Sequence, residues 1–137
     1  MIIVIYDICI INIEVMARKA GWLYILGNEY MPSIYKIGIT GNLKKRKDGL
    51  YCGDSGVPYP FHIVDKVYVQ DTRKHEKLIH KKLANDRINP RREFFGIRVY
   101  EKGDSPEDVI NKKRVVDENV LKPVMKIFND LRFNGGL

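Results

Sequence analysis

Short runs of β-branched and aromatic residues, separated by turn-forming residues, predict several strands in this chain. Residues 22–26 and 34–39 form two such runs, and Gly27-Asn28 and Pro32-Ser33 between them predict a hairpin with a rather long loop. A third strand is predicted over residues 61–69. The pattern therefore predicts a small sheet built around a hairpin.

The polar stretches after the second and third strands predict two helices. Thr40 is placed to cap a short basic helix over residues 43–47, which ends near Gly49. The other helix is predicted to begin at Asp71 or Thr72 and to run to about residue 85, before an Asn-Pro pair that prevents its continuation.

The last third of the chain is predicted to be mainly helical. Residues 93–100 still have strand character. After them, Ser105-Pro106 is typical of a helix start, and apolar residues at three- and four-residue steps predict a last amphipathic helix from near Pro123 to Asn134. Its charges are balanced rather than basic, so we expect its apolar stripe to pack on the domain and not on a membrane.

The length and the placement of charge indicate one central unit. A chain of 137 residues suits one domain with extensions, and we divide it into an N-terminal extension at 1–20, a domain at 21–100 and a C-terminal helical extension at 101–137. The domain carries 15 basic and 8 acidic residues, whereas each extension is balanced. This excess is either a solubility charge or a positive field for nucleic acid or an anionic membrane surface.

The first fifteen residues are rich in isoleucine and are interrupted by polar side chains. They are too short and too polar to span a bilayer and lack the pattern of a signal peptide. They could form an extra edge strand, a weak membrane anchor, or upstream sequence ahead of a start at Met16. The two cysteines, Cys9 and Cys52, form no disulfide framework or metal spacing, so we expect an intracellular protein.

Strand parity selects candidate residues in the second strand. Side chains alternate along a strand, so Lys36 and Gly38 share one face while Tyr35 points to the other. A glycine inside a strand marks either a close approach by a ligand or another backbone, or a bulge at the strand end. The face that carries Lys36 is therefore the candidate working face.

Two charged side chains on the predicted helices are further candidates. Glu76 shares a helical stripe with apolar residues, which is explained either by the helix dipole or by a divalent cation beside phosphate. One arginine, Arg46, lies inside a basic run and could bind a phosphoryl group bidentately. His75 and His80 are five residues apart, about 140° around a helix, so they do not form a zinc pair.

Several ordered segments resemble a known family. "WLYIL", "YKIG", an arginine eight positions after Gly38 and a helix with an early glutamate are similar to the GIY-YIG nuclease superfamily. More closely, "MPSIYKIGIT", "SGVPYPF", "EKLIHKKL" and "NPRREFF" resemble its branch common in phages and large DNA viruses. The resemblance covers roughly residues 21–100.

The resemblance implies an α+β domain, with a small three-stranded antiparallel sheet flanked by helices, that hydrolyses DNA phosphodiesters with one Mg²⁺ or Mn²⁺. By position, Tyr24 matches the tyrosine of the first half-motif and Gly38 the glycine of the second. Arg46 matches the arginine that stabilises the transition state, and Glu76 the glutamate that holds the metal. Lys44, Lys45 and Lys47 are expected to contact the DNA backbone.

The chain departs from the better-known nucleases at Lys36, where they have a tyrosine that helps to activate water. Lys36 could replace it only in a neutral form, favoured by burial or a nearby cation; otherwise it would clamp a phosphate, leaving the base to Tyr24 or to water. His80 is either a secondary catalytic candidate or a packed structural residue. Glu93 could lie at the rim, but an ion pair with Arg91 and Arg92 is the simpler interpretation.

These observations favour a metal-dependent DNA endonuclease. The alternative of another class is a non-catalytic DNA-binding module of the same fold, and the third is a membrane-associated protein anchored by residues 1–15. Specificity would come from a small element or from a protein partner, because little chain follows residue 100.

Overall fold

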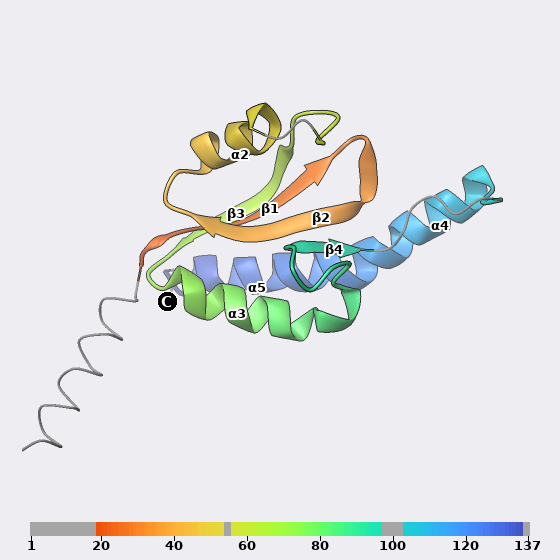
Figure 1. Cartoon of the computed structure of the whole chain (residues 1–137). Coiled ribbons are helices and arrows are strands. Elements are labelled where there is room, and N and C mark those ends of the chain that lie inside the picture. Colours follow the sequence, from red (N-terminus) through yellow and green to blue (C-terminus); the bar gives the residue numbers. More distant parts are fainter. Residues whose placement is uncertain (1–18, 54–55, 97–102, 136–137) are drawn as a thin grey trace, which may run out of the picture.

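The computed structural model describes residues 19–53, 56–96 and 103–135. Its sheet is open and antiparallel, with strand order β3-β1-β2-β4 (Figure 1). The strands are β1 (Gly21–Asn28), β2 (Met31–Thr40), β3 (His62–Val69) and β4 (Phe94–Gly96). The expected α+β class is confirmed. The sheet has four strands where the family resemblance implies three, and the fourth, β4, lies inside the stretch 93–100 to which the sequence gives strand character.

The hairpin of β1 and β2 closes more tightly than its sequence predicts. Only two residues separate the strands, because Pro32 and Ser33 lie inside β2 and not in a loop. The register shifts between the pairs Leu26–Lys36 and Asn28–Met31, so the missing N–H of Pro32 falls in an irregular stretch of the ladder. The Asn28 side chain supports the turn by accepting a hydrogen bond from the Tyr30 N–H at 3.0 Å.

Helix α2 comes directly after β2 in the chain, and helix α3 comes after β3. Helix α2 (Leu43–Cys52) is capped by Asn42, whose side chain accepts from the Lys45 N–H, so the predicted Thr40 cap is wrong. Thr40 instead accepts from the Asn42 N–H at 3.2 Å, and α2 continues through Gly49. Helix α3 (Thr72–Lys82) is capped by Asp71, as predicted, and a 3-10 turn at Ala84–Asp86 follows it.

The C-terminal helices form one continuous helical stretch, where the sequence predicts two separate helices. Helices α4 (Pro106–Val116) and α5 (Lys122–Phe133) are joined by a π-helical segment at Asp117–Leu121. Pro123 cannot donate a backbone hydrogen bond and would clash with the preceding turn of a regular helix. The wider π turn just before it lets the chain remain helical.

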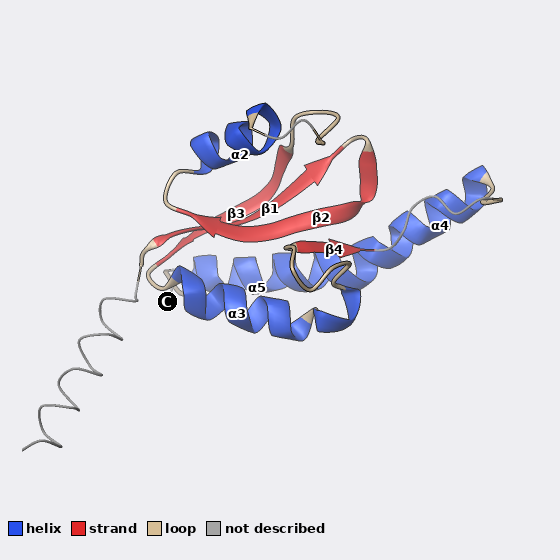
Figure 2. Ribbon diagram, in the orientation of Figure 1, coloured by secondary structure: helices blue, strands red, loops and turns tan. Residues whose placement is uncertain are grey.

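The helices cover the two faces of the sheet unequally. Figure 2 shows α2 on one face and α3 with α5 on the other. On the latter face, Val124 and Phe128 of α5 are fully buried with Ile25, Ile37 and other sheet residues. The expectation that the last amphipathic helix packs on the domain is confirmed.

A smaller apolar cluster lies between the sheet and α2. It consists of Tyr24, Leu26, Leu43 and Phe61, with Trp22, Leu50 and Phe94 packed against it. None of the described helices is long and apolar enough to cross a membrane. The predictions for residues 1–15 and for the end of the 93–100 strand fall outside the described residues.

Candidate active site

The two faces of β2 carry different chemistry, as strand parity predicts. Tyr35 and Ile37 are buried in the core formed with α3, α4 and α5. Lys36 points to the opposite face, where its ammonium lies 5.3 Å from the centre of the Phe94 ring. We call this second face the α2 face. Gly38 pairs with Tyr24 of β1, so the tyrosine of the first half-motif and the glycine of the second both lie on the α2 face.

Gly38 is needed because two side chains occupy the space beside it. A Cβ at this residue would lie 2.5 Å from the Tyr24 Oη and 2.9 Å from an oxygen of Glu93. The β1–β2 register is regular from Trp22 to Leu26, whose partners run from Thr40 to Lys36, so the alternative of a bulge at Gly38 is wrong. The glycine lets a phenol and a carboxylate approach each other across the strand.

The helix periodicity of α2 identifies the arginine that faces the sheet. Arg46 lies three residues after Leu43 and four before Leu50, and both leucines pack in the cluster with Tyr24. Arg46 also lines an open cleft of about 320 Å³ with Lys45 and with Thr40, Asn42 and Gly49. Lys44 and Lys45 are exposed, whereas Lys47 is half-buried and pairs with Asp48 at 3.4 Å.

The Tyr24 hydroxyl is buried and makes no hydrogen bond of good geometry with any described residue. Burial raises the pKa of Tyr24, the Arg46 guanidinium beside it lowers that pKa, and the carboxylates of Glu93 and Glu76 raise it further. The net direction is upward, so the phenol stays protonated at neutral pH. One tyrosine therefore experiences the charges of Arg46, Glu93 and Glu76 together.

Glu76 comes from α3 and brings a carboxylate to the same place. Its Oε2 is buried and unpartnered among the described residues. Burial, and then the charge of Glu93, raises the pKa of Glu76 from 4.5 to about 7, although Lys36, Arg87 and Arg73 lower it. Glu76 is the fifth residue of α3 and lies beyond its first turn, so the helix dipole does not explain its presence.

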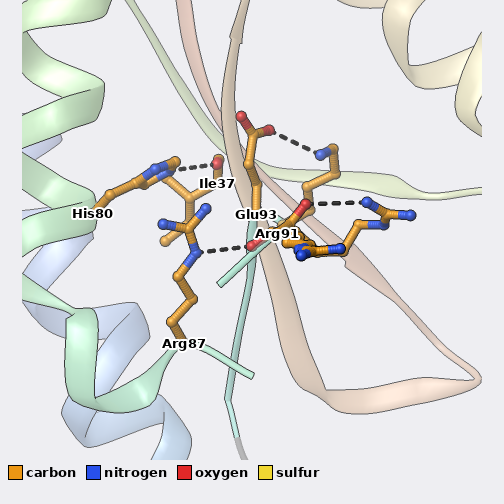
Figure 3. Close-up of polar contacts among 7 residues, drawn as sticks. Ile37, His80, Arg87, Arg91 and Glu93 are labelled. Carbon is orange, nitrogen blue, oxygen red and sulfur yellow. Dashed lines mark hydrogen bonds and ion pairs between the residues drawn. The ribbon is translucent and has the colours of Figure 1, made fainter. Parts of the chain in front are cut away.

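Lys36 and Glu93 form an ion pair at this site. Their Nζ and Oε2 atoms are 3.0 Å apart, and the Lys36 side chain is only 7% exposed (Figure 3). The proposed pairing of Glu93 with Arg91 and Arg92 is therefore wrong. Held by this carboxylate, the Lys36 side chain suits a phosphate clamp better than a base.

His80 attaches α3 to β2. Its Nε2 lies 2.9 Å from the Ile37 carbonyl oxygen, to which it donates (Figure 3). Its ring packs on Phe95. Burial lowers the pKa of His80, so the ring is neutral at neutral pH. Because Glu76 lies one helical turn before His80, this hydrogen bond fixes the carboxylate relative to Gly38. A direct catalytic role for His80 stays a prediction.

Tyr24, Lys36 and Gly38 lie on the α2 face, whereas Glu76 and His80 come from α3, which packs on the opposite face. The two groups approach each other at β2, where His80 binds the Ile37 carbonyl and the charge of Glu76 acts on Tyr24. Lys44 and Lys47 lie outside the site itself.

Sequence reasoning undervalued Glu93. It lies just before β4, where its carbonyl accepts from the Ile37 N–H at 3.1 Å, and strand parity does not extend to a residue outside a strand. Only its place in "NPRREFF" could have drawn attention to it.

The donor set fits a hard divalent cation. The described residues contain no cluster of three or more histidine, cysteine or acidic side chains that could hold a metal. Mg²⁺ does not need one, since it keeps several waters and binds through one or two carboxylates together with substrate phosphates. The unpartnered buried oxygen of Glu76 is the kind of ligand that such an ion takes.

The fold and this site together define a small α+β domain with a group of partly buried polar and charged side chains beside the second strand of its sheet. Residues 21–118 match the T5orf172 domain, and the chain belongs to this family, which is generally classed as GIY-YIG-like. No curated protein matches the chain, and no solved structure does.

Proposed function

We propose that this protein is a metal-dependent DNA endonuclease that hydrolyses phosphodiester bonds. The observation that carries the proposal is the grouping of Tyr24, Arg46 and Glu76, three side chains from different elements, in which the charges of Arg46 and Glu76 both act on the buried Tyr24 hydroxyl. Tyr24 and Glu76 both have raised pKa values, and buried titratable residues with specific charge partners are typical of an active site.

Glu76 would hold the cation, Mg²⁺ or Mn²⁺, through its unpartnered oxygen. Such a cation supplies Lewis-acid stabilisation of the charge on the phosphodiester. Glu76 must lose its proton to bind it, and its pKa of about 7 makes this possible at neutral pH.

Arg46 would stabilise the phosphoryl group in the transition state. Its guanidinium is exposed in the cleft yet close enough to act on the Tyr24 hydroxyl. A guanidinium binds two phosphate oxygens at once, which a lysine cannot do. A phosphate bound there would lie between Arg46 and Tyr24.

Tyr24 and Lys36 would position the water and the phosphate. The raised pKa of Tyr24 keeps its hydroxyl protonated, so it would donate a hydrogen bond and orient the attacking water. Lys36, held by Glu93, would present a fixed positive charge where the better-known nucleases have a tyrosine. Lys44 and Lys45 on the exposed side of α2 would bind the DNA backbone without reading its sequence.

The test is nicking of supercoiled plasmid in Mg²⁺. Glu76→Ala should lower the rate by more than about 100-fold, since losing even an outer-shell partner of a metal costs about 10- to 100-fold. Glu118→Ala, a glutamate that pairs with Lys122 on the helix surface, is the matched control and should cut like wild type. Equal cutting by Glu76→Ala would show that Glu76 does not hold the metal.

One observation favours the second candidate, a DNA-binding module without catalysis. The Lys36–Glu93 ion pair occupies the place of the tyrosine that activates water in related nucleases. This alternative expects DNA binding that weakens with salt and no cleavage in Mg²⁺ or Mn²⁺. The plasmid assay distinguishes the two candidates.

A further inference from the structure

An aromatic pair lies on the α2 face of the sheet at the start of β1. The rings of Trp22 and Tyr68 meet edge to face, with centroids 5.3 Å apart and planes at 77°. The ammonium of Lys66 lies 5.1 Å from the Trp22 ring centre. We call these three residues the aromatic platform.

The platform is continuous with the candidate active site. Trp22 precedes Tyr24 by two residues on β1, so the two side chains point to the same face, about 6.5 Å apart along the strand. Lys66 and Tyr68 of β3 are the cross-strand partners of Tyr24 and Trp22. A nucleic-acid strand whose phosphate is held beside Tyr24 and Arg46 would therefore place a neighbouring nucleotide over the platform.

Packing of the sheet core does not account for the platform. Val67 and Val69 of β3 point the other way and are buried in the main core. Tyr68 keeps 49% of its surface exposed, and Trp22 is only partly covered by the smaller cluster with Leu50. Two large ring systems, with a cation beside them, are thus available to a planar ligand.

We propose that the aromatic platform binds an unpaired nucleobase by stacking, so that the preferred substrate is DNA with a single-stranded segment next to the phosphate in the cleft. Aromatic rings stack on the face of any base, whereas a base inside a duplex has its faces covered by its neighbours. Lys66 adds a positive charge that follows the backbone of the strand. This inference rests on the proposed function and names its substrate class.

The single tryptophan of the chain makes the test direct. The full-length protein in EDTA, which prevents cleavage, is titrated with an oligo-dT strand and separately with a blunt duplex of equal length, while Trp22 fluorescence is recorded. Stacking on the platform should quench the fluorescence with the single strand and leave it nearly unchanged with the duplex.

A matched pair of variants locates the effect. Tyr68→Ala should weaken oligo-dT binding roughly 5- to 100-fold, the range for losing one stacked base, and leave duplex binding within about twofold. Tyr30→Ala removes an exposed tyrosine from the other aromatic pair, Tyr30–Tyr59, at the opposite end of β1, and should bind both DNAs like wild type. Tyr68 is half exposed, so its replacement should leave the fold intact.

Two results would overturn the inference. One is unchanged Trp22 fluorescence when labelled oligo-dT is shown by anisotropy to be bound; the other is wild-type oligo-dT affinity in Tyr68→Ala. Because these titrations contain no free metal, they are independent of cleavage. If single-stranded DNA stacks on the platform but the protein nicks no plasmid, the proposed nuclease activity is contradicted and the binding role of the platform is supported.

Discussion

The two faces of the sheet are built for different purposes. The face covered by α3, α4 and α5 is closed by a continuous apolar core, in which Tyr35 places its hydroxyl 2.8 Å from an oxygen of Asp117. The α2 face has a smaller core and contains the unpartnered hydroxyl of Tyr24 and the paired charges of Lys36 and Glu93. An unpartnered buried polar group costs stability, so the Tyr24 hydroxyl, and the Glu76 oxygen whose charge acts on it from α3, need an explanation other than folding.

The largest expected effect on stability comes from the covered face. Phe128→Ala should lower the free energy of unfolding by about 3–5 kcal/mol, because the ring is fully buried and its removal leaves a cavity. Urea unfolding measures the loss. Phe133→Ala, on the same helix but 93% exposed, is the control and should change stability by less than about 0.5 kcal/mol. Equal losses in the two variants would contradict the assigned packing of α5.

Gly38→Ala tests the α2 face, with a smaller effect on stability and a large one on activity. The added methyl group would meet the Tyr24 hydroxyl at 2.5 Å, so the ring or the strand must move. We expect a loss of about 1–3 kcal/mol from overpacking and a fall in nicking of about 100-fold, since small displacements of reacting groups are that costly. Gly41→Ala has nothing within 4 Å of its new methyl group and should behave like wild type.

The raised pKa of Glu76 predicts a pH dependence of metal binding. A proton competes with the cation for this carboxylate, so the apparent affinity for Mg²⁺ should fall about tenfold per pH unit below about pH 7 and level off above it. Glu93, Lys36, Arg87 and Arg73 are the charged groups that set this pKa. Thermal shifts with Mg²⁺ at several pH values measure the profile, which Glu76→Gln should abolish.

The raised pKa of Glu76 also makes the stability of the metal-free protein depend on pH. The folded-state pKa lies above the ordinary value of 4.5, so the folded state binds this proton more tightly than the unfolded chain. The stabilisation is fully present below about pH 4.5 and is lost as the pH rises through about 7. Glu76→Gln should therefore gain stability relative to wild type on going from about pH 5 to pH 8; a constant difference would show that the carboxyl is not buried as described.

The smallest effect is expected on the exposed side of α2. Lys44→Ala should weaken DNA binding only a few-fold, to a similar degree for all sequences, and reduce the salt slope of binding by about one. Binding isotherms at several salt concentrations measure both quantities. A change in sequence preference would mean that Lys44 contacts bases and not the backbone.

Sequence periodicity predicted the strands and helices well, because each of these elements depends mainly on residues that are close in the sequence. Strand parity placed Lys36 and Tyr35 on opposite faces, as the structure has them. Ile79 and Leu83, the apolar residues that share the helical stripe of Glu76, are buried in the core. Two wrong predictions concern helix ends, where neighbouring residues compete for the same role. Asn42, and not Thr40, caps α2. A π-helical turn before Pro123 keeps the chain helical where a break between two helices was expected.

The site was only partly predictable for a similar reason. Gly38 and Glu76 stood out because each violates the pattern of its own element. The partner of Lys36 could not be found this way, since Glu93 reaches it from a chain segment 57 residues away and outside any strand. Periodicity puts Arg46, one of the four basic residues of the run 44–47, on a stripe with two leucines. That these leucines pack with Tyr24 follows only from the placement of α2 on the sheet.

The central claim is that the site formed by Tyr24, Arg46 and Glu76 hydrolyses DNA. The most direct measurement is the rate at which wild-type protein nicks supercoiled plasmid in Mg²⁺, against a baseline in EDTA. The account predicts nicking that requires the metal and that disappears in Glu76→Ala but not in Glu118→Ala. Wild-type protein that binds the plasmid yet leaves it supercoiled in both Mg²⁺ and Mn²⁺ would contradict it.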